Sequence, residues 1–306
     1  MPPRPQLIVD RPAGRNYNSD YYTRKYLDSL LVEMRIVDST LASTKTTLFG
    51  AALNTPVMLG APGGAPGQSD VFTTEAEAVA ETGSVMWVAG RTTAEEIREC
   101  VKRGAKVIQV IKPYADNARL IEDLKKAEEA GCFAVASDLD HAYGKDGGYD
   151  KQGESVFAPK SSQELRDIVS ALNVPFIAKG VLSVQDAVKC KEAGVSGILL
   201  SHHHSIMDCA VPPLMILPAI REAVGDDYTI IVDCSIDTGA DAFKALALGA
   251  DAVCTVRAAM KVMAKGKDEI ADFLNKMTGE LRHFMNRTAS PDVKHIDPSV
   301  IHQMMF

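Results

Sequence analysis

Three strand–helix units follow one another between Pro175 and Arg257, and this stretch constrains the fold more than any other part of the sequence. Each unit has a short apolar run, then polar residues, then an amphipathic run. Short apolar runs of this kind are typical of parallel strands that are buried on both faces. The strands are expected at 175–180, 197–205 and 228–235, and a further strand is expected at 252–257. Parallel strands joined by helices predict an α/β fold.

The same alternation is present in the preceding part of the chain. Four more apolar runs predict strands at 56–61, 84–90, 106–111 and 133–140. Several predicted helices end at a glycine, which easily takes the left-handed conformation that closes a helix; these are Gly83, Gly104, Gly131, Gly194 and Gly249. Eight strand–helix units with right-handed crossovers predict a (β/α)8 TIM barrel. A helix over 270–288 is expected to close the chain.

The residues before the first barrel strand are expected to form a short N-terminal arm. Residues 1–19 contain four prolines and predict irregular structure, followed by one helix or two short ones over 20–34. RIVDST and TTLFG, within 35–50, are expected to form a small strand pair. The whole chain, 1–306, is then expected to be a single domain, with the arm at 1–50 and the barrel at 51–306.

The composition restricts the class of partner. Of the 306 residues, 46% are hydrophobic and 24% are charged, and the formal net charge of −7 argues against nucleic acid, whose binding needs a basic surface. No apolar run approaches the roughly 18–20 residues of a membrane span, and the N-terminus has no charged-then-apolar signal pattern. Six cysteines without a CxxC pair indicate a reduced, cytoplasmic protein. The expected partner is a small-molecule substrate.

Ionisable residues follow the predicted strands where a barrel builds its active site, at the carboxyl ends. Lys179 ends a strand that should be buried, and lysine is rarely buried unless it is paired or functional. It would act as a cation beside an anionic cofactor or intermediate, or as an amine nucleophile. The alternative is a lysine that extends its ammonium to solvent at the barrel rim.

The run His202 to His204 predicts a single functional imidazole. Successive side chains of an extended strand alternate sides, so the three cannot bind one metal ion, and no metal site is expected. One histidine as general base is the better interpretation, and a surface cluster is the alternative. Asp138 and Asp140 have the period-two spacing that aims both carboxylates the same way, so one can orient the imidazole while the other caps a turn.

Other segments carry weaker signals. Gln109 is placed to hydrogen-bond a planar ligand or to form a polar rim, and Arg91 to bind an anion or to face solvent. The glycine-rich loop with Gly63, Gly64 and Gly67 would let backbone approach a ligand. The polar connection 141–163 is long for a compact domain, which is typical of a lid or a binding loop.

Three stretches together resemble the FMN-dependent α-hydroxy acid oxidase and dehydrogenase family, which includes glycolate oxidase and lactate oxidase. They are AKGVLSVQDAVKCKEAGVSGILLSHH (178–203), DAFKALALGADAV (241–253) and ELRHFMNRT (280–288). The resemblance runs from DYY (20–22) to HIDPSVI (295–301) and is that of a divergent member.

The resemblance implies FMN as cofactor and a homo-oligomer, commonly a tetramer. It implies that Lys179 lies at the N1/C2 edge of the flavin, that His203 is the base in substrate oxidation, and that Asp140 pairs with His203. It places Arg257 at the flavin phosphate. The full set of positions implied for the cofactor is Gly60, Ala61, Ala89, Gln109, Asp138, Lys179, Ser201, Asp233 and Arg257.

The sequence departs from the family pattern at the site rather than in the scaffold. The two arginines that would hold a substrate carboxylate are replaced near Ile206 and Tyr143, and Ile111 stands for a tyrosine. The phosphate loop after the strand at 228–235 reads Cys-Ser-Ile-Asp at 234–237, Val256 replaces a glycine, and Asp138 replaces a threonine. A small 2-hydroxy acid held by a bidentate arginine clamp is therefore not expected.

Three functions remain open on the sequence. The first is a divergent FMN-dependent oxidoreductase acting on a 2-hydroxy acid-like substrate. The second is a flavin-independent barrel lyase or isomerase that uses Lys179 with Asp138 or Asp140 for Schiff-base or enolate chemistry. The third is a non-catalytic barrel that binds a ligand.

Overall fold

The computed structural model describes residues 18–61, 69–204 and 206–304. The proline-rich arm at 1–17 and the glycine-rich loop at 62–68, with Gly63, Gly64 and Gly67, lie outside the described residues.

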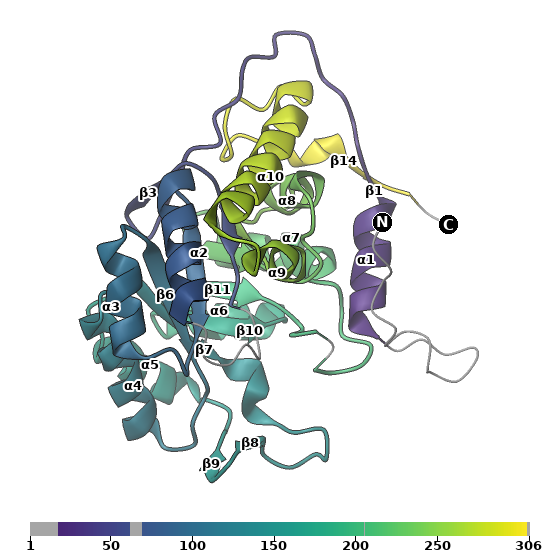
Figure 1. Ribbon diagram of the computed structural model, residues 1–306. Coiled ribbons are helices and arrows are strands. Elements are labelled where there is room, and N and C mark those ends of the chain that lie inside the picture. The colour runs from purple at the N-terminus through teal and green to yellow at the C-terminus, as the bar shows by residue number, and fades with distance from the viewer. Residues whose placement is uncertain (1–17, 62–68, 205, 305–306) are drawn as a thin grey trace.

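Eight parallel strands close into a barrel, as the sequence predicts, in the order β10-β11-β12-β13-β4-β5-β6-β7 (Figure 1). The strands are β4 (Val57–Leu59), β5 (Val85–Ala89), β6 (Lys106–Ile111), β7 (Ala134–Asp138), β10 (Phe176–Val181), β11 (Gly197–Leu200), β12 (Thr229–Val232) and β13 (Ala252–Thr255). Each of these strands lies within a predicted apolar run or extends it by one residue. The TIM barrel is confirmed.

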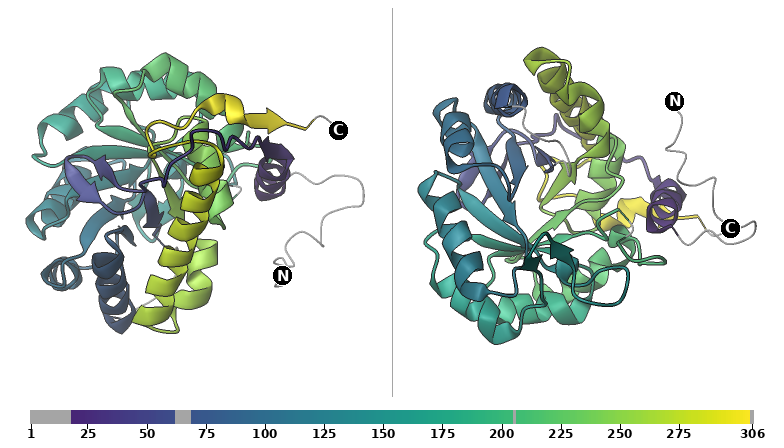
Figure 2. Two further views of the ribbon diagram at one scale, coloured as in Figure 1. Left: turned by 90° about the horizontal axis from the view of Figure 1, so that it is seen from above. Right: turned by 60° about the horizontal axis from the view of Figure 1, so that its bottom comes forward.

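Helices surround the ring of strands (Figure 2). They are α2 (Ser69–Thr82), α3 (Ala94–Lys102), α4 (Asn117–Glu129), α5 (Ser162–Ser170), α6 (Val184–Glu192), α7 (Pro213–Val224), α8 (Gly239–Ala247), α9 (Arg257–Met263) and α10 (Lys267–Arg287). The starts of α3, α5 and α8 are fixed by capping boxes, in which a side-chain hydroxyl accepts from the third backbone N–H of the helix and an acidic side chain accepts in return. These caps satisfy backbone donors that the helix itself leaves unpaired.

The barrel interior is an apolar layer with polar groups above it. The layer includes Met58, Trp87, Ile108, Ala136, Ile177, Leu199 and Ile231. Because side chains alternate along a strand, the residue two positions after an inward-facing one also faces inward. Lys179 follows Ile177 in this way, and Asp138 follows Ala136. The two residues are register partners on neighbouring strands, so the fold places them side by side at the carboxyl end of the barrel.

The N-terminal region differs from the expectation. Helix α1 (Ser19–Ser29) ends five residues before the predicted 34, because the chain becomes extended as β1 (Leu30–Val32). Strand β1 pairs antiparallel with β14 (Ile301–Gln303), which follows the short 3-10 helix η3 (Pro298–Val300), so segments near the two ends lie side by side (Figure 1). The strand pair expected within 35–50 is only half right. TTLFG contributes β2 (Thr46–Leu48), which pairs with β3 (Ala51–Leu53) in a hairpin, whereas residues 36–40 form no strand.

Several predicted strands end earlier than expected, and two of these changes affect the site. Strand β7 stops at Asp138, and Asp140 lies in the 3-10 helix η2 (Leu139–Ala142). Strand β11 stops at Leu200, and His203 has a φ of 47° in the turn that follows. The strand alternation used for the aspartates and the histidines therefore does not apply to them, because a turn conformation replaces extended backbone at these positions.

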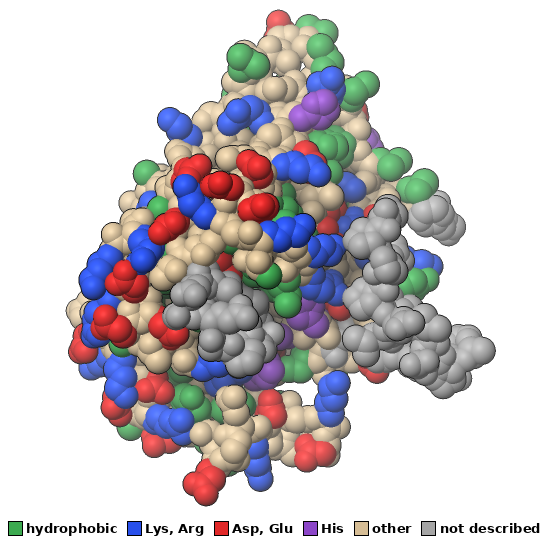
Figure 3. Space-filling view, in the orientation of Figure 1, with side chains coloured by type: hydrophobic (Ala, Val, Ile, Leu, Met, Phe, Trp, Pro, Cys, Tyr) green, Lys and Arg blue, Asp and Glu red, His purple; other side chains and the backbone are tan. Residues whose placement is uncertain are grey.

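The long connection after η2 has structure of its own. It contains a short hairpin of β8 (Lys151–Gln152) and β9 (Ser155–Val156). Tyr143 and Tyr149 also form a bridge, with stacked rings. None of the helices in the described parts of the chain is long and apolar enough to cross a membrane. On the face shown in Figure 3, acidic and basic side chains are interspersed rather than gathered into one basic surface.

Candidate active site

Lys179 and Asp138 form a buried ion pair at the centre of the site. The Lys179 Nζ is 2.6 Å from Asp138 Oδ1, and the two side chains are 9% and 8% exposed. Lys112, just beyond β6, is 2.8 Å from the other carboxylate oxygen. Burial opposes both charges, but the charges of Lys179, His203 and Lys112 hold the pKa of Asp138 well below its usual value. Burial likewise acts to lower the pKa of Lys179, yet its acidic neighbours, first among them Asp138, raise it. Lys179 is therefore an ammonium at neutral pH.

His203 is held by Asp140 and touches Lys179. Its Nδ1 is 3.1 Å from Asp140 Oδ2 and 3.2 Å from Lys179 Nζ. Its backbone N–H donates to Ser201 Oγ at 3.0 Å, which fixes the turn after β11. The structure thus brings together His203, Asp140 and Lys179, the three residues that the resemblance implied for catalysis.

Gly180 makes room for the Asp140 carboxyl. Its φ is +86°, a conformation that side chains rarely tolerate, and a Cβ at this position would lie 2.3 Å from Asp140 Cγ. The glycine after Lys179 therefore allows β10 to pass against η2. The sequence motif Lys-Gly at 179–180 places the cation and the aspartate of the His203 pair next to each other.

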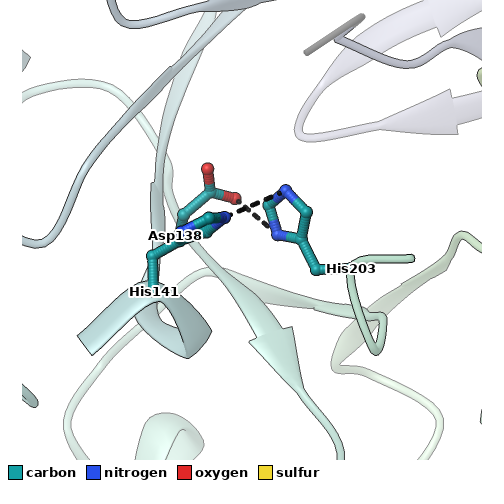
Figure 4. A group of neighbouring side chains, drawn as sticks. All are labelled: Asp138, His141 and His203. Carbon is teal, nitrogen blue, oxygen red and sulfur yellow. Dashed lines mark hydrogen bonds and ion pairs between the residues drawn. The ribbon is translucent and has the colours of Figure 1, made fainter. Parts of the chain in front are cut away.

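His141 also belongs to the site, although the sequence analysis did not single it out. Its Nε2 is 3.2 Å from His203 Nε2, and its Nδ1 is 3.2 Å from Asp150 Oδ2. Figure 4 shows His141 on η2, with Asp138 and His203 close by. Burial lowers the pKa of His141, and the charges of His203 and Lys112 lower it further. Its position directly after Asp140 was the available signal, because a short helical turn can place neighbouring residues on one site.

The other two histidines of the run point elsewhere. His202 is buried, with its Nε2 2.7 Å from Thr23 Oγ1 on α1 and its Nδ1 3.7 Å from Cys234 Sγ. His204 is 41% exposed, with its Nδ1 3.9 Å from Asp20. A single histidine of the run thus lies at the Lys179–Asp138 pair, as expected, although the reason is the turn and not strand alternation.

Several of the positions implied for the cofactor are held by local hydrogen bonds. Gln109 donates its amide to Thr92 O at 2.8 Å, and at 3.3 Å to the backbone oxygen of Ala89. Ser201 Oγ lies 3.3 Å from Cys234 Sγ. Asp233 is buried and accepts from the Cys234 N–H at 2.6 Å. Contacts of these residues with a cofactor stay predictions.

At the end of β4, Gly60 and Ala61 lie beside β13. The Gly60 N–H donates to Thr255 O at 3.0 Å, and a Cβ on Gly60 would lie 2.5 Å from Val256 Cγ2. Ala61 is partly buried against the barrel interior. Position 60 therefore requires glycine, because Val256, just after β13, comes too close for a side chain.

A second group of polar side chains gathers where α1, α9 and the loop after β12 meet. Arg257 donates to both Asp20 oxygens, at 2.8 and 3.2 Å, and to Ser235 Oγ at 3.1 Å. Arg24 of α1 donates to Ser235 O at 3.2 Å and to Asp241 at 2.8 Å. Arg24 and Lys112 are site residues that the sequence analysis missed. Asp237, the acid of the altered phosphate loop, is exposed.

The chemistry of these two groups fits FMN. Lys179 is a buried, protonated cation at a strand end, which suits the anionic edge of a reduced flavin. Arg257 and Ser235 offer a guanidinium and a hydroxyl to a phosphate, after strands β13 and β12, where barrels commonly bind one. Asp237 is exposed, so solvent and ions screen its negative charge and weaken its repulsion of a bound phosphate.

Ionisable groups gathered at the carboxyl ends of a closed (β/α)8 barrel are the arrangement of a barrel enzyme. The sequence model described as FMN-dependent dehydrogenase matches residues 1–162 and 144–303, and the chain belongs to this family. The resemblance, the expected oxidoreductase class and FMN as cofactor are thereby confirmed.

Similar individual proteins support membership of this family. A 2-hydroxyacid oxidase of Dictyostelium discoideum is 26% identical over 89% of this chain and 79% of its own length. An L-lactate oxidase of Alicycliphilus denitrificans is 38% identical over 44% of this chain, a match that spans 37% of that protein. A solved mandelate oxidase variant with an FMN adduct superposes with a TM-score of 0.81, covering 98% of this chain and 95% of that one at 22% identity, which supports the fold.

Proposed function

We propose that this protein is an FMN-dependent oxidoreductase that oxidises a 2-hydroxy acid-like substrate, with His203 as base and Lys179 beside the flavin. The observation that carries the proposal is the contact of His203 with both Asp140 and Lys179 at the barrel mouth. Bound FMN supplies the acceptor for the two electrons of the oxidation.

Asp140, His203 and Lys179 each have a separate role in the proposed reaction. Asp140 accepts from His203 Nδ1 and stabilises the imidazolium that forms when His203 takes a proton from the substrate. Nε2 is then the nitrogen of His203 that meets the substrate. Lys179 keeps its positive charge, because acidic neighbours raise its pKa, and it stabilises negative charge that develops beside it.

The substrate is expected to differ from a small 2-hydroxy acid held by two arginines. Lys112 is the cation that faces Asp138 from the other side, and its side chain is 28% exposed. An ammonium acts as a point charge and cannot form the bidentate contact of a guanidinium. We infer a substrate whose acidic or carbonyl end is recognised by charge rather than by a planar clamp.

The two alternative functions are less well supported. A Schiff-base reaction needs a neutral amine, whereas Lys179 is paired and its pKa is raised. A barrel without catalysis would not need the buried charges at 138 and 179, since buried ionisable groups are costly. A cytoplasmic location and a homo-tetramer stay predictions of the sequence.

The test is anaerobic reduction of the bound flavin, followed by absorbance. The purified protein is expected to carry FMN, and a panel of L-lactate, glycolate, mandelate and larger 2-hydroxy acids is expected to contain a compound that bleaches it. His203→Gln should slow that reduction by about 10²–10⁴-fold, the usual contribution of a general base. His302→Gln, on the exposed edge pair with Glu33, serves as the matched control. A colourless protein that does not take up FMN contradicts the proposal.

A further inference from the structure

The rings of His141 and His203 approach each other through their Nε2 atoms. Their Nε2 atoms are 3.2 Å apart, and the rings meet edge to face at 84°. Each ring has a carboxylate at its other nitrogen: Asp150 lies 3.2 Å from His141 Nδ1, and Asp140 lies 3.1 Å from His203 Nδ1. An ionised carboxylate can only accept, so both Nδ1 atoms carry hydrogen. In neutral rings the two Nε2 lone pairs then face each other at 3.2 Å, a repulsion that a shared proton or a bound cation would relieve.

The alternative tautomer of His203 carries its hydrogen on Nε2 and a lone pair on Nδ1. Lys179 Nζ lies 3.2 Å from His203 Nδ1 and would donate to it if that nitrogen carried a lone pair. That lone pair would then also face the Asp140 oxygen at 3.1 Å, which is repulsive. The ammonium has Asp138 as an acceptor at 2.6 Å and can turn its hydrogens there. The partners therefore favour hydrogen on Nδ1.

The spacing of the two Nε2 atoms matches ligands of one metal ion. Imidazole binds zinc at about 2.0–2.1 Å, so two such nitrogens at octahedral to tetrahedral angles lie roughly 2.9–3.4 Å apart. The observed 3.2 Å falls in this range. Because the rings now meet edge to face, one ring has to rotate about its Cβ–Cγ bond to aim both lone pairs at the ion.

A carboxylate stands close to the histidine pair. One ligand atom each of Asp138, His141 and His203 can be chosen so that all three lie within 4.8 Å of one another. Asp138 Oδ1 approaches His203 at Nδ1, 3.8 Å away, so the carboxylate has to turn toward the Nε2 side to join the ion (Figure 4). Asp138 is the last residue of β7 and directly precedes η2, which carries His141. We propose that these three residues form a binding site for a divalent transition metal that favours imidazole, such as Zn²⁺ or Co²⁺.

Both positive and negative side chains lie next to the proposed metal site. Lys112 and Lys179 both contact Asp138, so an ion has to share this carboxylate with them, and the two imidazoles are the stronger ligands. Asp140 and Asp150 place two negative charges behind the rings. A carboxylate behind a ligating histidine orients the ring and makes its free nitrogen more basic.

Metal binding does not require the proposed oxidation to occur. A bound ion would, however, inhibit that oxidation. Both uses require the Nε2 of His203, so an ion bound there removes the base. If His203 is the base, Zn²⁺ inhibits flavin reduction and a chelator restores it. If His203 has no role in oxidation, metal binding itself is unchanged. The two proposals therefore fail separately.

The experiment measures metal binding without turnover. The full-length, FMN-containing protein is treated with a chelator, desalted and titrated with Zn²⁺ by calorimetry, and with Co²⁺ by visible absorption. Saturable binding of a single ion per chain is expected, and both His141→Gln and His203→Gln should abolish it. Asp150→Asn keeps every ligand and should weaken binding by about 10–100-fold, the usual effect of removing the partner of a ligating histidine.

The matched control is His295→Gln. His295 also has a carboxylate at Nδ1, with Asp292 at 2.8 Å, but its side chain is 71% exposed and it lies in a different part of the chain. This variant should bind Zn²⁺ as the wild type does. The proposal is wrong if the wild type binds no ion, in which case the rings share a proton, or if His141→Gln binds as tightly as the wild type. Thermal melting of each variant separates lost binding from lost folding, and Asp150→Asn still tests the site if a ligand variant does not fold.

Discussion

At the scale of single residues, Glu75 of α2 is a buried acid outside the site. It is 1% exposed, and neither carboxylate oxygen has a hydrogen-bond partner in the part of the chain that the structure describes. Burial raises the pKa of Glu75 to about 7. The folded protein therefore binds this proton more tightly than the unfolded chain does, and stability falls as pH rises from the ordinary glutamate range through about 7.

Glu75→Gln should remove this loss of stability. Above pH 7 the variant is expected to be more stable than the wild type by up to about 3 kcal/mol, since each unit of pKa shift corresponds to about 1.4 kcal/mol. At pH 4 the difference should be small. Urea unfolding at pH 4 and pH 8 measures it, with the exposed Glu129→Gln as control. An equal effect of Glu75→Gln at both pH values would contradict the role of ionisation.

Gly180 provides a second prediction at this scale. Gly180→Ala places a methyl group against Asp140 in a left-handed backbone, so it should lower stability by more than the roughly 1–2 kcal/mol of the backbone conformation alone. It should also slow flavin reduction, because Asp140 moves away from His203. Gly147→Ala is the matched control: its φ is +83° and its added Cβ has nothing within 4 Å. Equal melting temperatures for the two variants would show that the contact with Asp140 is unimportant.

At the scale of elements, α1 and α9 are joined by the contact of Asp20 with Arg257. An arginine that binds a phosphate has to share its guanidinium with this carboxylate. Arg257→Ala should therefore weaken FMN binding by about 10–100-fold, as expected for a hydrogen bond to a charged group worth roughly 1.5–3 kcal/mol. Asp20→Asn removes the competing charge and should tighten binding. Fluorescence titration of the flavin-free protein with FMN measures both, and an Arg257→Ala variant with unchanged affinity would remove this residue from the phosphate site.

The elements were predictable to different degrees. The eight strands followed from apolar runs, because a strand buried on both faces has to be apolar along its length. The ends of β7 and β11 were not predictable in this way, since polar residues can either continue a strand or enter a turn. The turn after β11 depends on the positive φ of His203, a conformation that is uncommon for residues other than glycine and that no apolar pattern indicates.

The same limit applies to the candidate site. The resemblance pointed to Lys179, His203 and Asp140, and these residues are in contact. Arg24 was missed because it joins the site through an approach in space that no sequence spacing indicates, whereas His141 had a signal in its place directly after Asp140. Lys112 had a usable signal: like Lys179, it stands at the end of an apolar strand run.

At the scale of the whole molecule, the barrel closes between its first and last strands. β4 pairs with β13, and β1 pairs with β14. The contact of Asp20 with Arg257 joins residues 237 positions apart. The barrel and the arginine group are therefore completed by the same late part of the chain.

This closure has a consequence for synthesis on the ribosome. A chain made from its N-terminus presents β4 long before its partner β13 exists, and an unpaired strand edge is prone to pair with other chains. The nascent barrel thus keeps an open edge until β13 has emerged. Chaperones that hold nascent chains would protect this protein during that interval, and a pause in translation before residue 252 would lengthen the interval in which it aggregates.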